Sequence, residues 1–190
     1  MRRLVLLAVV LLCMPLYAQL DKSLERPFAA GGQVKMELEG GDYKISPTDT
    51  NHIAVTWEQR GNVEVKIDTN GGTAKVSTIH TPHNNFHCEI EVPRTSDLYI
   101  RLSAGNLDIG AIKGNKDVES HAGNVDIAVV NPEDYSRVDA SLLAGNIDAS
   151  PFQGNKSGLF RSFDWHGNGR YRLHAHLMAG NLNLHAAHMD

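Results

Sequence analysis

Four residues in one short segment have the types and spacing of a metal site: His80, His83, His87 and Cys88. Neutral imidazole nitrogens and a thiolate sulfur are ligands that zinc and related transition metals prefer, and these separations allow the side chains to surround one ion. The alternative interpretation is a polar loop around Pro82 that ends in an unreactive, buried thiol. The residue types alone do not choose between the two.

A second group of histidines lies near the C-terminus of the sequence. His174 and His176 are two residues apart, which places them on one face of a strand, and His185 and His188 follow the next turn. Such a cluster could bind a metal, but a solvated strand face or a terminal cap explains it equally well.

Three aspartates, Asp108, Asp126 and Asp148, occupy the same position in repeated segments. Stacked in neighbouring strands they could share Ca²⁺, although calcium-binding repeats use denser ligand loops than this sequence has. Solvated aspartates are the alternative. Their equivalence also argues against glycan hydrolysis, which needs two carboxylates in different environments.

No arrangement of residues predicts nucleophilic catalysis. Cys88 stands beside His87, but no third residue that would orient the histidine is evident. We therefore predict no catalytic residues and no cofactor.

A repeated sequence motif predicts the strands and bends that position these side chains. Four segments share the core Ala-Gly-Asn, and their glycine–asparagine pairs are Gly105-Asn106, Gly123-Asn124, Gly145-Asn146 and Gly180-Asn181. Weaker copies begin at Gly40 and Gly61. Most successive copies are separated by about 20 residues or by about twice that number. The last two are 35 residues apart, a separation that would contain one repeat and an insertion, or an irregular pair of repeats.

Apolar and polar residues alternate after each motif, as in Leu107-Asp108-Ile109, which is typical of a strand with one buried face. Glycine suits a tight bend with positive φ, and stacked asparagines can hydrogen-bond to one another in a ladder. The pattern predicts an all-β, single-domain parallel β-solenoid, or β-helix, with coils of about 18–22 residues.

The rest of the chain is also strand-like and divides simply. Short apolar runs between residues 34 and 102 are separated by turn-rich segments, and no helical periodicity is sustained. We expect a signal peptide over residues 1–18, a lead-in over 19–32 and the β-solenoid domain over 33–188.

The N-terminal segment has the order of a secretory leader: basic Arg2-Arg3, an apolar run from Leu4 to Met14, and Ala18 at the cleavage position. The apolar run is shorter than the roughly 20 residues of a spanning helix, so no transmembrane segment remains after cleavage, whereas an uncleaved leader would be a loose anchor. Cleavage changes the formal net charge from −4 to −6. A mildly acidic surface makes nucleic acid an unfavourable partner.

The repeated Ala-Gly-Asn units and the block from Phe163 to Leu173 resemble the exported bacterial putative-adhesin family, a domain of unknown function related to the auto-transporter adhesin head type. The resemblance covers roughly Val34 to His185. It implies a β-solenoid at the cell envelope and carries no catalytic residues with it.

Together these features predict an exported, non-enzymatic cell-envelope protein with an adhesin-like binding or scaffold surface. Its compartment would be periplasmic, cell-surface or secreted, and its partner a cell-envelope protein or a glycan. The alternative is a metal-binding or glycan-processing protein built on the same scaffold.

Overall fold

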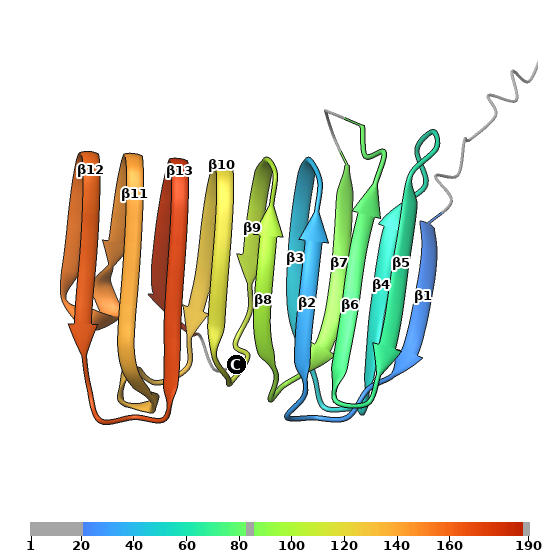
Figure 1. Ribbon diagram of the computed structural model, residues 1–190, viewed down its shortest axis with the longest axis horizontal. Helices are drawn as coiled ribbons and strands as arrows, with labels where there is room; N and C mark the ends of the chain where they lie inside the picture. Colours follow the sequence, from blue (N-terminus) through green and yellow to red (C-terminus); the bar gives the residue numbers. More distant parts are fainter. Residues whose placement is uncertain (1–20, 83–85, 188–190) are drawn as a thin grey trace, which may run out of the picture.

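The structure, a computed structural model, describes residues 21–82 and 86–187. These residues form one 13-stranded sheet that is folded over into two layers, with the strands of each layer running side by side (Figure 1). Within these ranges no helix is long and apolar enough to span a bilayer. The leader predicted over 1–18 and the end of the predicted domain at His188 lie outside the described residues.

The all-β prediction is confirmed, and the only helical elements among the described residues are two short 3-10 turns. In chain order the elements are β1 (Asp21–Pro27), β2 (Gln33–Leu38), β3 (Gly41–Thr48), β4 (His52–Glu58), β5 (Glu64–Asn70), β6 (Thr73–Ile79), β7 (His87–Pro93), β8 (Asp97–Leu102), β9 (Gly105–Ile109), β10 (Lys116–Val129), η1 (Pro132–Asp134), β11 (Tyr135–Ala149), η2 (Ser150–Phe152), β12 (Gly154–His166) and β13 (Tyr171–Ala186). β1 lies within the segment expected to be a lead-in.

The prediction of a parallel β-solenoid is wrong, because the sheet is mixed and its strands are not stacked in chain order. β1, β4 and β7 pair antiparallel, as do β5 with β6 and β11 with β12. β13 pairs in parallel with both β10 and β11 and therefore lies between them. In a parallel solenoid each coil would lie beside the next one in the chain and run in the same direction.

The Ala-Gly-Asn motif marks the bend where the chain passes from one layer to the other. β10, β11 and β13 are continuous through it, and their motifs are aligned residue for residue. The four motif glycines have φ between +118° and +138°. A Cβ on Gly123 would lie 1.7 Å from the carbonyl oxygen of Gly105, and a Cβ on Gly180 would lie equally close to that of Gly123. Only glycine permits this approach of backbones.

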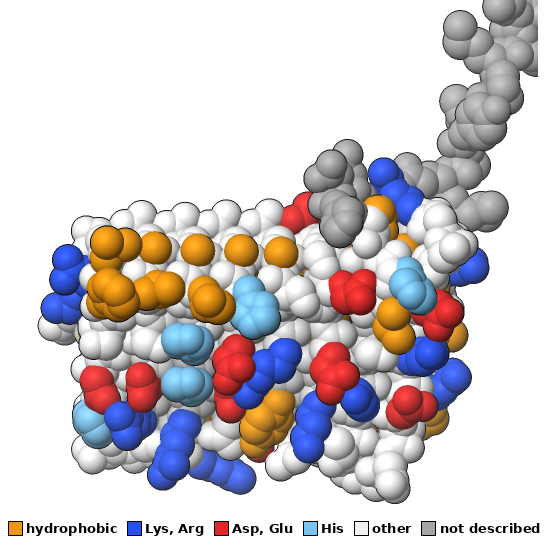
Figure 2. Space-filling model, turned by 45° about the horizontal axis from the view of Figure 1, so that its top comes forward, with side chains coloured by type: hydrophobic (Ala, Val, Ile, Leu, Met, Phe, Trp, Pro, Cys, Tyr) orange, Lys and Arg blue, Asp and Glu red, His pale blue; other side chains and the backbone are white. Residues whose placement is uncertain are grey.

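Alternation along each strand then separates core from surface. The side chains of Leu107, Val125, Ile147 and Leu182, one from each motif strand, are at most 1% exposed. They pack between the layers with the apolar residues of β2 to β8. Figure 2 shows a band of hydrophobic side chains along one bend edge, on a face where most of the other coloured side chains are charged or histidine.

The two ends of the stack are closed by strands that carry basic residues on their core side. On β12, Lys156 and Arg161 are aligned with the buried Ile147 and Leu142 of β11. On β1, the partners of the buried Trp57 and Ile53 are Lys22 and Arg26. Charges at such positions discourage further strands from adding to the ends, and long side chains can cover apolar surface with their stems.

Aromatic residues complete the cap at the β12 end. Phe163 and Trp165 pack against the core, and the rings of Trp165 and Phe152 are 4.9 Å apart.

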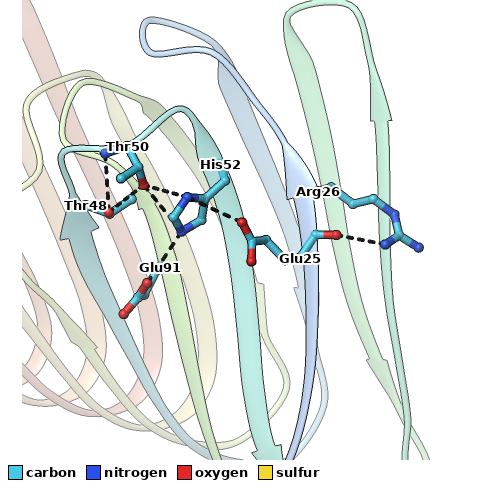
Figure 3. Close-up of polar contacts among 6 residues, drawn as sticks. All are labelled: Glu25, Arg26, Thr48, Thr50, His52 and Glu91. Carbon is cyan, nitrogen blue, oxygen red and sulfur yellow. Dashed lines mark hydrogen bonds and ion pairs between the residues drawn. The ribbon is translucent and has the colours of Figure 1, made fainter.

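At the other end, His52 on β4 lies between two carboxylates from neighbouring strands (Figure 3). Its Nδ1 is 3.6 Å from Oε1 of Glu25 on β1, and its Nε2 is 3.7 Å from Oε2 of Glu91 on β7. The hydroxyl of Thr50 also hydrogen-bonds to this ring. The cluster therefore connects the terminal strand to the two strands beneath it, with ionic character whenever the ring is protonated.

Among residues 21–82 and 86–187 the core contains one charged side chain, Lys116 at the start of β10, which is 1% exposed. Its Nζ donates to the carbonyl oxygen of Ile112 at 2.7 Å and to the hydroxyl of Tyr135 at 3.0 Å. Burial lowers the pKa of Lys116 to about 8, and the nearby carboxylate of Asp97 offsets part of this effect. The group is satisfied by neutral acceptors and no carboxylate contacts it directly.

This lysine predicts a rise of stability with pH. Between about pH 8 and about pH 10 the unfolded chain still holds a proton that the folded chain has released, so unfolding becomes less favourable by about 2 kcal/mol. The Cys88 thiol opposes this rise from about pH 9, because burial raises its pKa to about 12 and the unfolded chain loses that proton first. Tyr43 and Tyr135, whose pKa values are also raised mainly by burial, oppose it above about pH 10. Because these groups are common to both chains, urea denaturation should show the lysine's contribution as the difference between the natural chain and Lys116→Met. Lys113→Met, at an exposed lysine of the same loop, should retain it, and a rise that persists in Lys116→Met would show another group to be responsible.

Candidate functional site

The candidate site is the outer face of β7, β3, β9, β10, β13 and β11, which we call the ladder face. Strand alternation places the asparagine of each motif on this face, and the in-register alignment sets the asparagines side by side. The spacing between neighbouring strands is about 4.8 Å, close enough for one amide to reach the next.

The asparagines form a continuous hydrogen-bonded row. Asn146 donates to Asn181 at 3.0 Å, Asn181 to Asn124 at 2.8 Å, and Asn124 to Asn106 at 3.0 Å. Asn106 in turn donates to Oδ1 of Asp42 at 2.7 Å. An ionised carboxylate can only accept, so Asp42 requires every amide in the row to donate toward it. Chains of aligned hydrogen bonds polarise one another, which favours this single direction.

His87 ends the row beyond Asp42. Its Nδ1 lies 3.5 Å from Oδ2 of Asp42, and both side chains are accessible to solvent. The sequence does contain a signal for Asp42, because the weaker copy that begins at Gly40 has aspartate where the other copies have asparagine. In the structure Gly41 is aligned with Gly105, and Asp42 with Asn106. The sequence contained no comparable signal for His87 at this position.

A second row, two residues further along the strands, contains the aspartates expected to stack. Asp108 and Asp126 are neighbours, but Asn183 on β13 separates Asp126 from Asp148. The amide of Asn183 donates to Oδ1 of Asp126 at 2.7 Å. The insertion of β13 therefore replaces a like-charge contact with a hydrogen bond.

The two rows border a shallow hollow of about 370 Å³ at the β7 end of the ladder face. Its polar lining is mixed in charge and comes from β3, β7, β9 and β10: Asp42, Lys44, His87, Glu89, Asn106, Asp108 and Asp126. Lys44 and Glu89 form an exposed pair with 3.8 Å between Nζ and Oε1. These groups can donate and accept hydrogen bonds over a broad, solvent-facing area.

The residues of the predicted metal site are not brought together where the structure describes them. Cys88 points into the core and is 2% exposed, whereas His87, the preceding residue of the same strand, points outward. Burial raises the pKa of the Cys88 thiol to about 12, which opposes the thiolate that a metal requires. His80 is exposed at the end of β6, and His83 lies outside the described residues. Among residues 21–82 and 86–187 no three potential ligands converge.

His174 and His176 share one outer face, on the opposite layer from the ladder. The Nδ1 atom of His176 hydrogen-bonds to the hydroxyl of Ser141 at 2.7 Å. His185 follows the bend of the same strand and therefore lies in the other layer, and His188 is outside the described residues. The strand bend thus separates the parts of this predicted cluster.

Comparison with known proteins supports the fold. No family model and no curated protein matches the chain. A putative cell adhesion protein from Clostridium sporogenes matches 86% of this chain and 98% of its own, with a TM-score of 0.51 and 14% identity.

Putative adhesins from Parabacteroides distasonis and Parabacteroides merdae are more distant. They align over 58% and 67% of this chain and over 58% and 65% of their own, with TM-scores of 0.29 and identities of 10% and 12%. At such identities a match shows the fold alone. The match to the Clostridium sporogenes protein therefore supports a fold shared with that putative cell adhesion protein, and not the auto-transporter head type that the resemblance implied.

Proposed function

We propose that the protein is an exported, non-enzymatic binding protein of the cell envelope, and that the ladder face binds a linear glycan. The observation that carries the proposal is the row from Asp42 through the four motif asparagines, in which amide and carboxylate groups repeat at the strand spacing. A polymer with a hydroxyl-bearing repeat can meet such a row at several points, each through an ordinary hydrogen bond.

The carboxylates of this face suit binding better than acid–base catalysis. Asp108 and Asp126 are adjacent on parallel strands, and both lie on the outer face of the sheet, where neither is buried. General acid catalysis by a carboxyl group needs a partner in a different environment, as in glycosidases. The name of the Clostridium sporogenes neighbour, a putative cell adhesion protein, agrees with a binding role. The leader-like segment at the N-terminus supports export.

The ladder is the part to test. We expect residues 19–190 to bind insoluble cell-wall glycan or a linear polysaccharide from a soluble panel, with a dissociation constant measured by calorimetry or sedimentation. The double variant Asn106→Ala/Asn124→Ala removes the middle of the row and should weaken binding by about tenfold or more, since each hydrogen bond contributes about 1 kcal/mol.

The matched control is Ser141→Ala/His176→Ala, which removes a cross-strand hydrogen bond from the opposite outer face and should leave binding unchanged. Equal weakening by both variants would place the glycan elsewhere. Failure to bind any member of the panel would reject the glycan proposal, and cleavage of a bound polysaccharide would show the protein to be an enzyme.

A further inference from the structure

An apolar ridge runs along the bends at the β12 end of the stack. We define it as Leu143 and Ala144 of β11, Met178 and Ala179 of β13, and Leu159 and Phe160 of β12. At each bend two consecutive residues face solvent, so the strand alternation is interrupted. Figure 2 shows the ridge as part of a band of hydrophobic side chains along the edge between the two outer faces.

The ridge collects every large hydrophobic side chain that is exposed in the described part of the chain. Leu143, Met178, Leu159 and Phe160 are 40%, 45%, 62% and 79% exposed. Strand pairing aligns Ala144 with both Ala179 and Leu159, so the side chains form two adjoining rows across three strands. Contiguous apolar surface of this kind marks a site of interaction more often than isolated exposed residues do.

The fold does not require apolar residues at these positions. In the equivalent bends before Gly105 and Gly123, the position of Leu143 and Met178 is occupied by Ser103 and His121. All four bends have the same backbone conformation at glycine. Polar residues are therefore compatible with the bend, and the change to leucine, methionine and phenylalanine toward the β12 end has no explanation in core packing.

Phe160 makes the strongest case. Its φ is +51°, a conformation that bulky side chains rarely adopt, and it is the most exposed large hydrophobic residue described. Backbone strain of this sort is found at functional positions. The bend that presents Leu159 and Phe160 is flanked by Lys156 and Arg161, and the segment 154–163 contains no acidic residue.

We propose that the apolar ridge inserts into the interfacial region of a phospholipid bilayer that contains anionic lipids. The ridge is convex, because it follows the outside of the bends, and a fluid apolar phase accepts such a shape without a complementary groove. Two of its strands, β13 and β11, are paired on both sides. The third, β12, ends the stack, and its basic residues Lys156 and Arg161 discourage a further strand from adding there. Lys156 and Arg161 are exposed and flank this bend in the sequence, and their positive charges match anionic headgroups, the usual combination of apolar tip and flanking cations at membrane surfaces.

The proposal is tested by co-sedimentation of residues 19–190 with vesicles of phosphatidylcholine alone or mixed with phosphatidylglycerol. The natural chain should partition onto the mixed vesicles, and Leu143→Ser/Phe160→Ser should reduce the partition coefficient at least tenfold without lowering the thermal midpoint. Lys156→Gln should weaken binding to mixed vesicles only. His121→Ser, at the equivalent bend of β10, should have no effect.

Three outcomes would overturn the proposal: no binding of the natural chain to either vesicle, equal binding by the double ridge variant, or a natural dimer that the ridge variant converts to a monomer. The last would identify the ridge as a contact between two copies. Asn106→Ala/Asn124→Ala should bind vesicles normally, so failure of the ridge proposal and failure of the glycan proposal can be told apart.

Discussion

Gly123→Ala is expected to prevent folding. The residue has φ of +123°, and its Cβ would lie 1.7 Å from the carbonyl oxygen of Gly105 on the neighbouring strand β9. Neither backbone can retreat easily, because Gly180 approaches Gly123 from the other side just as closely. Left-handed strain and a backbone clash act together, so we expect a loss of more than about 4 kcal/mol, seen as insoluble protein or an absent urea transition.

Gly72→Ala is the matched control. Gly72 is exposed, its added Cβ would meet nothing within 4 Å, and its φ is not in the left-handed region. Reduced freedom of the unfolded chain should then make this substitution neutral or stabilising by up to about 1 kcal/mol. A Gly123→Ala chain that unfolds at the same urea concentration as the Gly72→Ala chain would contradict the close approach of the bends.

Val125→Asp should be nearly as damaging, for a different reason. Val125 is fully buried between Leu107 of β9 and Leu182 of β13, so an aspartate there would bury an unpaired carboxylate. We expect a loss of more than about 4 kcal/mol, measured by urea denaturation at neutral pH.

The neighbouring surface row supplies its comparison. Asp108 points out of the sheet beside Lys44 and Asp126, and Asp108→Ser removes both an attraction and a repulsion. The expected change is within about 0.5 kcal/mol. Similar losses for Val125→Asp and Asp108→Ser would mean that the inward and outward faces are assigned incorrectly.

The local structure could be predicted from the sequence because each prediction depended on a few neighbouring residues. Alternation around Asp108 and Asp126 gives the buried face, and Gly-Asn gives a bend whose asparagine reaches the adjacent strand. The short apolar runs between residues 34 and 102 correspond to strands of the structure, among them β2, β4, β5, β7 and β8.

The order and direction of the strands could not be predicted in this way. Similar motif strands fit beside one another in any order, so the pattern does not reveal that β13 lies between β10 and β11. The motif search does not detect β12, because this strand runs antiparallel to β11 and passes through the bend in the opposite direction. Its Ser157-Gly158-Leu159-Phe160 is aligned against Asn146, Gly145, Ala144 and Leu143, which is the motif in reverse. This strand accounts for much of the long step between Gly145 and Gly180.

The candidate site was predictable only in part, for the same reason. The repeated motif predicts the row of asparagines. It does not predict that the row ends at Asp42 and His87, because that end depends on β3 lying between β9 and β7. The four-ligand metal hypothesis treated His87 and Cys88 as neighbours in space. In a strand consecutive side chains point to opposite faces. Cys88 therefore points into the core and His87 to the outer face.

The position of β13 has a consequence for how the chain reaches its native state. In ordinary repeat proteins each unit contacts only its sequence neighbours, so folding can nucleate locally and spread, and units can be removed from an end. Here β10 and β11 cannot complete their pairing until β13 has been made and threaded between them. The part of the stack formed by β10, β13 and β11 should therefore form as one cooperative and slowly assembling unit, in which sequence-distant contacts dominate the barrier.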